Sequence, residues 1–220
     1  MTDAVVFDLD GLLLDTEQVW DEVRETLTRE RGGRWHDRAQ ADMMGMSSPE
    51  WSRYMHETLG LPDPPEELNR LVVERMLDRY RTALPLIDGA VEAVCRIATR
   101  WPLGLASSSN RQLIELALQL MSVADLFQVT VSSEEVERGK PAPDVYLEAA
   151  RRLGVAPERI TAIEDSSAGI RAAKAAGMRV VAIPNPHFPP AEDALALADL
   201  VLESLAELTA DAVESASSRP

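Results

Sequence analysis

The chain has 220 residues, with 37 acidic against 22 basic side chains and a formal net charge of −15 at pH 7. A protein that neutralises nucleic-acid phosphates or an anionic membrane surface needs a basic face, which so acidic a chain is not expected to have. We therefore expect no nucleic-acid partner and no membrane partner. With 45% hydrophobic and 27% charged residues, the composition is that of a globular protein with room for one domain and an insert.

The start of the chain lacks the basic flank and apolar core of a secretion signal, and no stretch approaches the roughly 18 apolar residues of a membrane span. We therefore expect a cytoplasmic protein, and a monomer, because no segment looks dedicated to self-association. The single cysteine, Cys95, excludes an intrachain disulfide and a thiolate metal cluster. It stands in a helical pattern with Val91 and Val94, so we expect it to be buried.

Short apolar runs recur along the chain. Residues 4–7 form a run rich in β-branched side chains, typical of a strand buried on both faces of a parallel sheet. Similar runs follow at residues 103–106, 129–131, 160–163 and 180–183. Segments of helical periodicity separate them, at residues 114–121, 145–153 and 170–176. This alternation predicts a doubly wound α/β fold with a parallel sheet, closed by a short strand at 201–202 and a helix at 205–213.

Residues 16–83 break the alternation and predict an all-helical insert. Apolar positions such as Trp20 and Leu27 recur at helical spacing, and glycines together with the prolines of residues 62–65 cut the segment into several helices. Residues 84–86 are the expected return to the sheet. The predicted domains are a core of residues 1–15 and 84–220 and a small helical cap of residues 16–83.

Acidic, hydroxyl-bearing and basic residues stand where the predicted strands end. They are Asp8, Asp10 and Gly11 after the first strand, Ser107, Ser108 and Asn110 after the second, Lys140 beyond the third, and Glu164 and Asp165 after the fourth. Ligands of an open parallel sheet bind beyond the carboxyl ends of its strands. We therefore predict that these segments form one site at one rim of the sheet.

Four carboxylates at one rim, from Asp8, Asp10, Glu164 and Asp165, repel one another unless a cation lies among them. Oxygen ligands without clustered histidine or cysteine select Mg²⁺ over zinc or copper. The three histidines lie far apart in the sequence, and none follows a predicted strand. These four residues therefore predict a Mg²⁺ site.

The same rim carries the groups of a phosphate site. Asp8 and Asp10 are two residues apart, so on an extended backbone both point the same way, and one can attack an electrophile while the other handles a proton. Gly11 brings backbone N–H groups close to an anion, Ser107 offers a hydroxyl and Lys140 a positive charge. Each of these residues on its own is also compatible with a simple turn or a helix cap. Together they favour phosphoryl chemistry.

Four segments resemble the four motifs of the haloacid dehalogenase superfamily: residues 8–17, DLDGLLLDTE; Ser107; residues 139–144, GKPAPD; and residues 164–166, EDS. The resemblance covers essentially the whole chain. It is closest to the branch with a helical cap inserted after the first strand, which holds β-phosphoglucomutases and sugar-phosphate phosphatases, and most of all to 2-deoxyglucose-6-phosphate and hexitol-phosphate phosphatases. It implies a Rossmann-like core with a cap.

The resemblance also implies residue roles. Asp8 would be the nucleophile that forms an aspartyl-phosphate, and Asp10 would protonate the leaving alcohol and then deprotonate water. Mg²⁺ would be held by the Asp8 carboxylate, the Asp10 carbonyl and Asp165, with Glu164 bound directly or through water. The residues alone left open which of the two first acids attacks, although the first strand points to Asp8.

The phosphoryl group would be bound by Ser107 and Lys140. The cap would lie over the site and select the leaving alcohol of a small phosphorylated metabolite. Candidate substrate contacts are Gly11, Glu17, Trp20, Gly45, Met46, Ser47, Ser108 and Asn110. Trp20 also fits a packing role inside the cap.

Several alternatives fit less well. Dehalogenation has no task for Asp10, and phosphonate cleavage needs a cap lysine, which residues 15–83 lack. A sugar phosphomutase must bind a second phosphate at the cap, whereas residues 43–48 contain no Lys or Arg. A non-catalytic phosphometabolite-binding module would not need Asp8 and Asp10 together. The sequence thus favours a Mg²⁺-dependent phosphatase of small phosphorylated sugars or polyols, with the mutase and the binding module as alternatives.

Overall fold

The computed structural model describes residues 1–44 and 46–216. Its strands are β1 (Ala4–Phe7), β2 (Leu103–Ser107), β3 (Phe127–Ser132), β4 (Ile160–Glu164), β5 (Arg179–Ala182) and β6 (Leu200–Val201). They pair in parallel in the order β3-β2-β1-β4-β5-β6, so β1 lies at the centre. The predicted α/β class and parallel sheet are confirmed.

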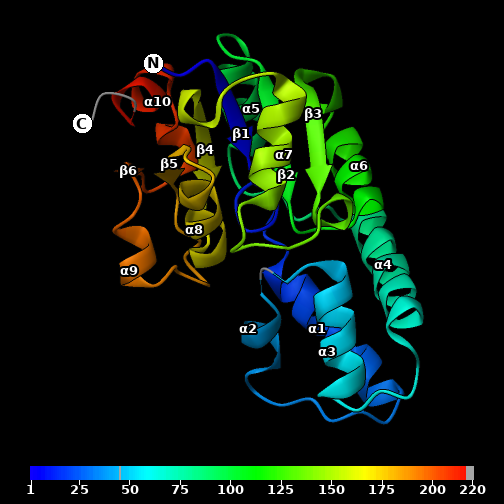
Figure 1. Ribbon diagram of the computed structural model, residues 1–220. Coiled ribbons are helices and arrows are strands. Elements are labelled where there is room, and N and C mark those ends of the chain that lie inside the picture. The colour runs from blue at the N-terminus through cyan, green and yellow to red at the C-terminus, as the bar shows by residue number, and fades with distance from the viewer. Residues whose placement is uncertain (45, 217–220) are drawn as a thin grey trace.

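Helices cover both faces of the sheet. Val5 and Phe7 of β1 enter one hydrophobic cluster and Ala4 and Val6 the other, as the two-residue period of a strand requires. The first cluster includes α5 (Ala90–Ala98), α6 (Arg111–Leu120) and α10 (Ala210–Ala216), and the second α7 (Asp144–Leu153) and α8 (Ser167–Ala175). Figure 1 shows α7 and α8 on the face nearer the viewer. The doubly wound arrangement is therefore confirmed.

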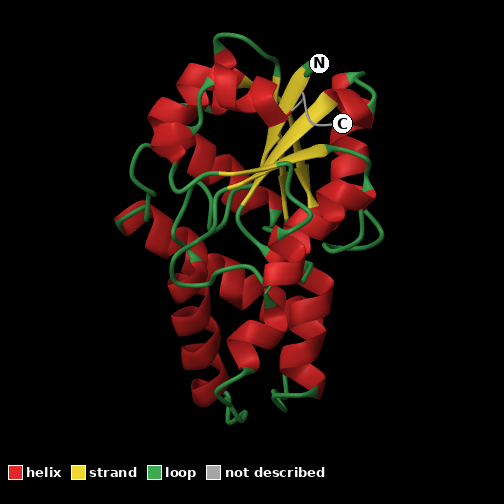
Figure 2. Cartoon of the chain, turned by 90° about the vertical axis from the view of Figure 1, so that its left-hand side faces the viewer, coloured by secondary structure: helices red, strands yellow, loops and turns green. Residues whose placement is uncertain are grey.

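All regular secondary structure in the described residues of the insert is helical. Its helices are α1 (Glu17–Glu30), α2 (Ala39–Met43), α3 (Ser48–Glu57) and α4 (Pro65–Thr82). Figures 1 and 2 show that this group lies at the end of the molecule opposite the two chain termini. The long α4 packs against α1 and α3 and also against α6 of the core. The domain boundaries at 15/16 and 83/84 stay a prediction.

The chain leaves and re-enters the core along two paired segments. The Asp15 N–H donates to the Pro85 carbonyl at 2.8 Å, and the Ile87 N–H donates to the Leu13 carbonyl at 3.1 Å. This antiparallel pairing holds the segment that leads into α1 beside the segment that returns from α4. Among the described residues, none of the helices has both the length and the apolar character needed to cross a membrane.

Two local predictions were wrong. Cys95 is exposed, because Ala93, Val94 and Ile97 form the buried stripe of α5 and Cys95 lies beside that stripe. The expected closing helix at 205–213 is split into a short 3₁₀ turn and α10. Thr209 causes the break, since its hydroxyl accepts from the N–H of the third residue of the new helix at 3.2 Å and so caps its start.

Candidate active site

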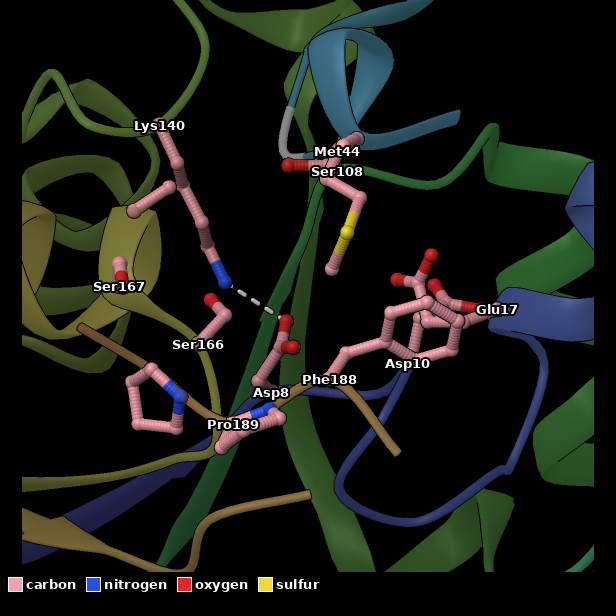
Figure 3. A pocket seen from close by; sticks show the side chains of 13 residues that line it. Asp8, Asp10, Glu17, Met44, Ser108, Lys140, Ser166, Ser167, Phe188 and Pro189 are labelled. Atoms are coloured by element: carbon pink, nitrogen blue, oxygen red, sulfur yellow. Dashed lines mark hydrogen bonds and ion pairs between the residues drawn. The ribbon is translucent and has the colours of Figure 1, made fainter. Parts of the chain in front are cut away.

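Residues from separate segments meet at the carboxyl ends of the central strands. Asp8 follows β1, Glu164 ends β4, and Lys140 lies between β3 and α7. A cavity of about 350 Å³ opens at this rim, between the core and the α2 region of the cap. Figure 3 shows Asp8 at its floor, with Lys140 and Met44 projecting into it. The strand-end rule thus placed the cavity correctly.

Lys140 joins two carboxylates. Its Nζ donates to Asp8 Oδ1 at 2.7 Å and to Glu164 Oε1 at 2.6 Å, and its side chain is only 3% exposed. The Tyr146 hydroxyl also donates to Glu164 Oε1, at 2.7 Å. Burial opposes the charge of Glu164, but Lys140 and Tyr146 hold the pKa of Glu164 below its usual value. A fixed positive charge therefore lies beside Asp8, where Figure 3 marks the ion pair.

Glu164 is also fixed from the start of α8. Its Oε2 accepts from the N–H groups of Asp165 and Ser166, at 3.0 and 3.1 Å, and from the Ser166 hydroxyl. The same hydroxyl caps α8 by accepting from the Gly169 N–H at 3.1 Å. A Cβ at Gly169 would lie 1.7 Å from Glu164 Oε1, so glycine alone leaves room for this carboxylate. Gly169 is not among the predicted site residues, although a glycine in a helix interior is a signal of close packing.

We expect Gly169→Ala to lower the free energy of unfolding by about 3 kcal/mol, because the added methyl group displaces the buried Glu164 carboxylate. Urea denaturation measures the change. Gly177→Ala is the matched control, since the nearest atom to a Cβ there is 4.0 Å away and only its left-handed backbone costs about 1 kcal/mol. Equal losses in the two variants would contradict the packing argument.

Three carboxylates form a buried cluster. Asp8, Glu164 and Asp165 each offer an oxygen, and these oxygens lie within 4.8 Å of one another. Asp165 Oδ1 is buried with no hydrogen-bond partner. Gly11, with φ +83°, makes the close approach possible, since a Cβ there would lie 2.2 Å from Asp165 Oδ2. Among the described residues, Lys140 supplies the one ammonium group that acts on all three acids.

Within the part of the chain that the structure describes, the positive charge of Lys140 does not balance the three carboxylates. Burial raises the pKa of Asp8 to about 8, with the Lys140 ammonium acting against the rise. Burial and the nearby Glu164 and Asp8 carboxylates raise the pKa of Asp165 well above its usual value. A partnerless buried oxygen among all-oxygen donors is the pattern that a hard divalent cation completes. The residues present therefore fit Mg²⁺.

Asp10 lies apart from this cluster, where α1 meets the sheet. Its Oδ1 accepts from the Thr16 hydroxyl at 2.6 Å and from Trp20 Nε1 at 3.4 Å. Its Oδ2 accepts from the Ser109 hydroxyl at 2.7 Å and from that of Ser107 at 3.3 Å. The carboxylate still lines the cavity together with Asp8. Asp10 is thus placed beside the nucleophile candidate, in contact with both core and cap.

A family model described as haloacid dehalogenase-like hydrolase matches residues 5–183. The chain belongs to this family. Hexitol phosphatase B of Escherichia coli K12 is 34% identical, over 94% of each chain. The phosphorylated carbohydrates phosphatase of Thermotoga maritima is 31% identical over 80% of this chain and 82% of that one. The crystal structure of CbbY from Rhodobacter sphaeroides in complex with phosphate has a TM-score of 0.86 and 28% identity, over 97% and 100% of the two chains.

These similarities confirm the predicted family and enzyme class, a haloacid dehalogenase-type phosphatase. The predicted roles of single residues are not tested by them. Asp8, Asp10 and Lys140 of this hydrolase line the cavity, whereas Ser107 does not. Ser107 is fully buried, because its hydroxyl accepts from the Ser109 N–H at 3.0 Å and points at Asp10.

The predicted substrate contacts fall into two groups. Glu17 and Ser108 line the large cavity, and Trp20 and Met46 line a smaller one beside it. Gly11 lies against Asp165, and Gly45 is outside the described residues.

Ser47 and Asn110 line neither cavity. Ser47 starts α3, where its N–H donates to Glu50 Oε2 at 2.7 Å. Asn110 starts α6, and its Nδ2 donates to Asn69 Oδ1 of α4 at 3.0 Å and to Glu134 Oε1 at 2.6 Å. Asn110 therefore connects core and cap beside the site, whereas the N–H and hydroxyl of Ser47 both donate to Glu50 within the first turn of α3.

The segment after β5 forms one wall of the large cavity and was not among the predicted site residues. Phe188, Pro189 and Pro190 line the cavity of this hydrolase, as Figure 3 shows for the first two. Asn185 holds the segment: its Nδ2 donates to the Gly11 carbonyl at 3.2 Å, and its Oδ1 accepts from the N–H groups of His187 and Phe188. The strand-end rule applied to the fifth strand as well as to the first four would have found this segment.

Proposed function

We propose that this protein is a Mg²⁺-dependent phosphatase that hydrolyses small phosphorylated sugars or polyols through an aspartyl-phosphate on Asp8. The observation that carries the proposal is the buried arrangement of Asp8, Lys140 and two further carboxylates at the floor of one cavity. The names of the two phosphatase relatives support the substrate class. The cavity of about 350 Å³ suits a small metabolite.

The reaction begins with attack by an Asp8 oxygen on phosphorus. A new bond forms between that oxygen and phosphorus, and the bond from phosphorus to the leaving alcohol oxygen breaks. Asp10, in its protonated form, donates its proton to that oxygen. Water then attacks the aspartyl-phosphate and gives its proton to the Asp10 carboxylate, so Asp8 is regenerated and inorganic phosphate is released.

The residues around Asp8 stabilise the negative charge on the phosphoryl group while these bonds form and break. Lys140 is buried and hydrogen-bonded, so its ammonium group needs no rearrangement to hold negative charge near Asp8. Asp8, Asp165 and Glu164 would hold Mg²⁺, which when bound supplies a Lewis acid for the phosphoryl oxygens. The apolar wall of Phe188 and Pro189 limits the entry of water.

Hydrolysis is favoured over phosphomutase activity by the cap surface nearest the site. The cap residues that line the large cavity are Glu17, Ala41 and Met44, and none of them carries the positive charge that a second phosphate would need there. Arg24 lines only the small cavity, where the Glu17 and Asp10 carboxylates oppose the binding of an anion. A binding module is disfavoured because Asp8 and Asp10 both line the large cavity.

We expect the purified protein to hydrolyse p-nitrophenyl phosphate with added Mg²⁺, and chelation by EDTA to lower the rate by at least about 100-fold. Re-addition of Mg²⁺ should restore it. Among phosphorylated hexoses, pentoses, hexitols and glycerol phosphate, kcat/KM should favour sugars or polyols over the aryl ester. Absence of turnover with every ester, in the presence of Mg²⁺, would contradict the proposed function.

A further inference from the structure

Arg24 of α1 carries a buried positive charge that has no role in the proposed reaction. The residue is 5% exposed. Its guanidinium carbon lies 4.5 Å from the centre of the Trp20 ring and 4.9 Å from that of the Trp51 ring. Aromatic rings attract a guanidinium group through its flat faces. Hydrogen-bond partners of Arg24 therefore have to approach in the plane of the group, at its edge.

The edge of this guanidinium group is poorly satisfied. Nη1 donates to Gln40 Oε1 at a long 3.4 Å, and Nε is buried with no hydrogen-bond partner. Burial lowers the pKa of Arg24 to about 10, with the Glu17, Asp10 and Asp21 carboxylates acting against the fall. A buried charged donor without a partner is costly. Arg24 is therefore expected to have a partner that the chain itself does not supply.

Arg24 faces a small cavity that adjoins the active site. This cavity, of about 40 Å³, is also lined by Trp20 and Trp51. It shares Asp10, Glu17, Met44 and Ser108 with the large cavity that contains Asp8. Its volume holds a few water-sized groups but no sugar ring. The part of a substrate that fits there is the end of a chain that extends past Asp10.

The groups around the small cavity suit a hydroxyl. Glu17 lines it and offers a carboxylate, which is held by Gln40 through a hydrogen bond from Nε2 to Oε2 of 2.9 Å. A hydroxyl both accepts and donates, so it can bind the Arg24 edge and the Glu17 carboxylate together. An anion in the same place would face the Glu17 and Asp10 carboxylates. Donor and acceptor side by side therefore select a neutral hydroxylated chain.

We propose that Arg24 is a substrate-specificity residue whose guanidinium edge binds a hydroxyl group of a polyol chain, at the end far from the phosphate. This inference rests on the proposed phosphatase function and goes beyond it, since it assigns the recognition of the leaving group to one residue of the cap.

The test compares two esters that have six carbons and differ in hydroxyl groups, a hexitol 6-phosphate and n-hexyl phosphate. Arg24→Met should lower kcat/KM for the hexitol ester by about 10- to 100-fold, as expected for the loss of a hydrogen bond to a charged donor. The loss for the hexyl ester should be at least tenfold smaller. Arg29→Met, at an exposed position on the same helix where the side chain is 72% exposed, is the matched control and should change neither value.

A second variant separates recognition from packing, because Arg24 also stacks on Trp20 and Trp51. Arg24→Ala leaves a space between the rings, and guanidinium added at millimolar concentration should restore part of the preference for the hexitol ester. Thermal unfolding of each variant reports the packing contribution. Equal losses on both esters, without rescue, would mean that Arg24 only supports the cap, and would overturn the inference.

Two further outcomes are decisive. A larger loss on a hexitol 1,6-bisphosphate than on the hexitol 6-phosphate would show that Arg24 binds an anion, and would overturn the assignment to a hydroxyl. Mg²⁺-dependent turnover by the wild type with no preference for the hexitol ester over the hexyl ester would overturn the inference and leave the proposed function intact. If the wild type hydrolyses none of the esters, both the inference about Arg24 and the proposed phosphatase function are overturned.

Discussion

Asp8→Asn is expected to abolish phosphatase activity, with kcat/KM lowered by at least about 10⁴-fold. The amide of Asn is too weak a nucleophile to form the bond to phosphorus that we propose for the Asp8 carboxylate. Lys140, which now donates to Asp8 Oδ1 at 2.7 Å, retains Glu164 as a partner, so we expect the variant to fold. Turnover of p-nitrophenyl phosphate with saturating Mg²⁺ measures the effect.

The control for this variant removes the same charge elsewhere. Asp125→Asn, at an exposed position in the turn before β3, should leave the rate unchanged. Acid-quenched wild type should carry a phosphoryl group on the peptide that contains Asp8, and the variant should carry none. Mg²⁺-dependent turnover retained in Asp8→Asn would exclude Asp8 as the nucleophile.

Asp10→Asn is expected to have the second-largest effect, and its size should depend on the leaving group. An alkoxide of a sugar or polyol needs a proton as it leaves, whereas p-nitrophenolate is stable without one. General acid catalysis contributes about 10²- to 10⁴-fold, so we expect a loss of about 10³-fold on a sugar phosphate and a clearly smaller loss on p-nitrophenyl phosphate. Comparison of kcat for the two esters measures the difference.

Asn at position 10 keeps one of the two oxygens, which can accept from Thr16 or from Ser109, and its NH2 group can donate to the other hydroxyl, so the contacts that hold the side chain between core and cap can be retained. A general loss of structure would lower the thermal unfolding temperature, which serves as the control. Equal losses on both esters, with unchanged stability, would remove Asp10 from the role of acid.

The sequence predicted the location of the site where the topology of a parallel sheet determines it. Parallel strands bring their carboxyl ends to one rim, so Asp8, Lys140, Glu164 and Asp165 could be placed together although they come from three distant segments. The alternation of strands and helices predicted the sheet for the same reason. Both predictions depend only on the order of elements along the chain.

Side-chain direction was less predictable, because it depends on packing between elements. Asn110 was expected to face substrate, but the start of α6 directs it to Asn69 of the cap. Ser107 and Ser108 are neighbours, yet only Ser108 lines the cavity. In the sequence, nothing distinguishes Arg24 from the other charged residues of a helix. Only the fold reveals that Trp20 and Trp51 enclose it.

The contact between α4 and α6 joins the cap to the core on one flank of the molecule. On this flank Asn110 donates hydrogen bonds to Asn69 of the cap and to Glu134 of the core. On the opposite flank, Ala41 of α2 and the segment from Phe188 to Pro190 border the large cavity from two sides. Figure 1 shows α2 facing α9 (Glu192–Leu195), which follows this segment, across the same flank. We therefore expect a phosphate ester to reach Asp8 between α2 and the segment from Phe188 to Pro190.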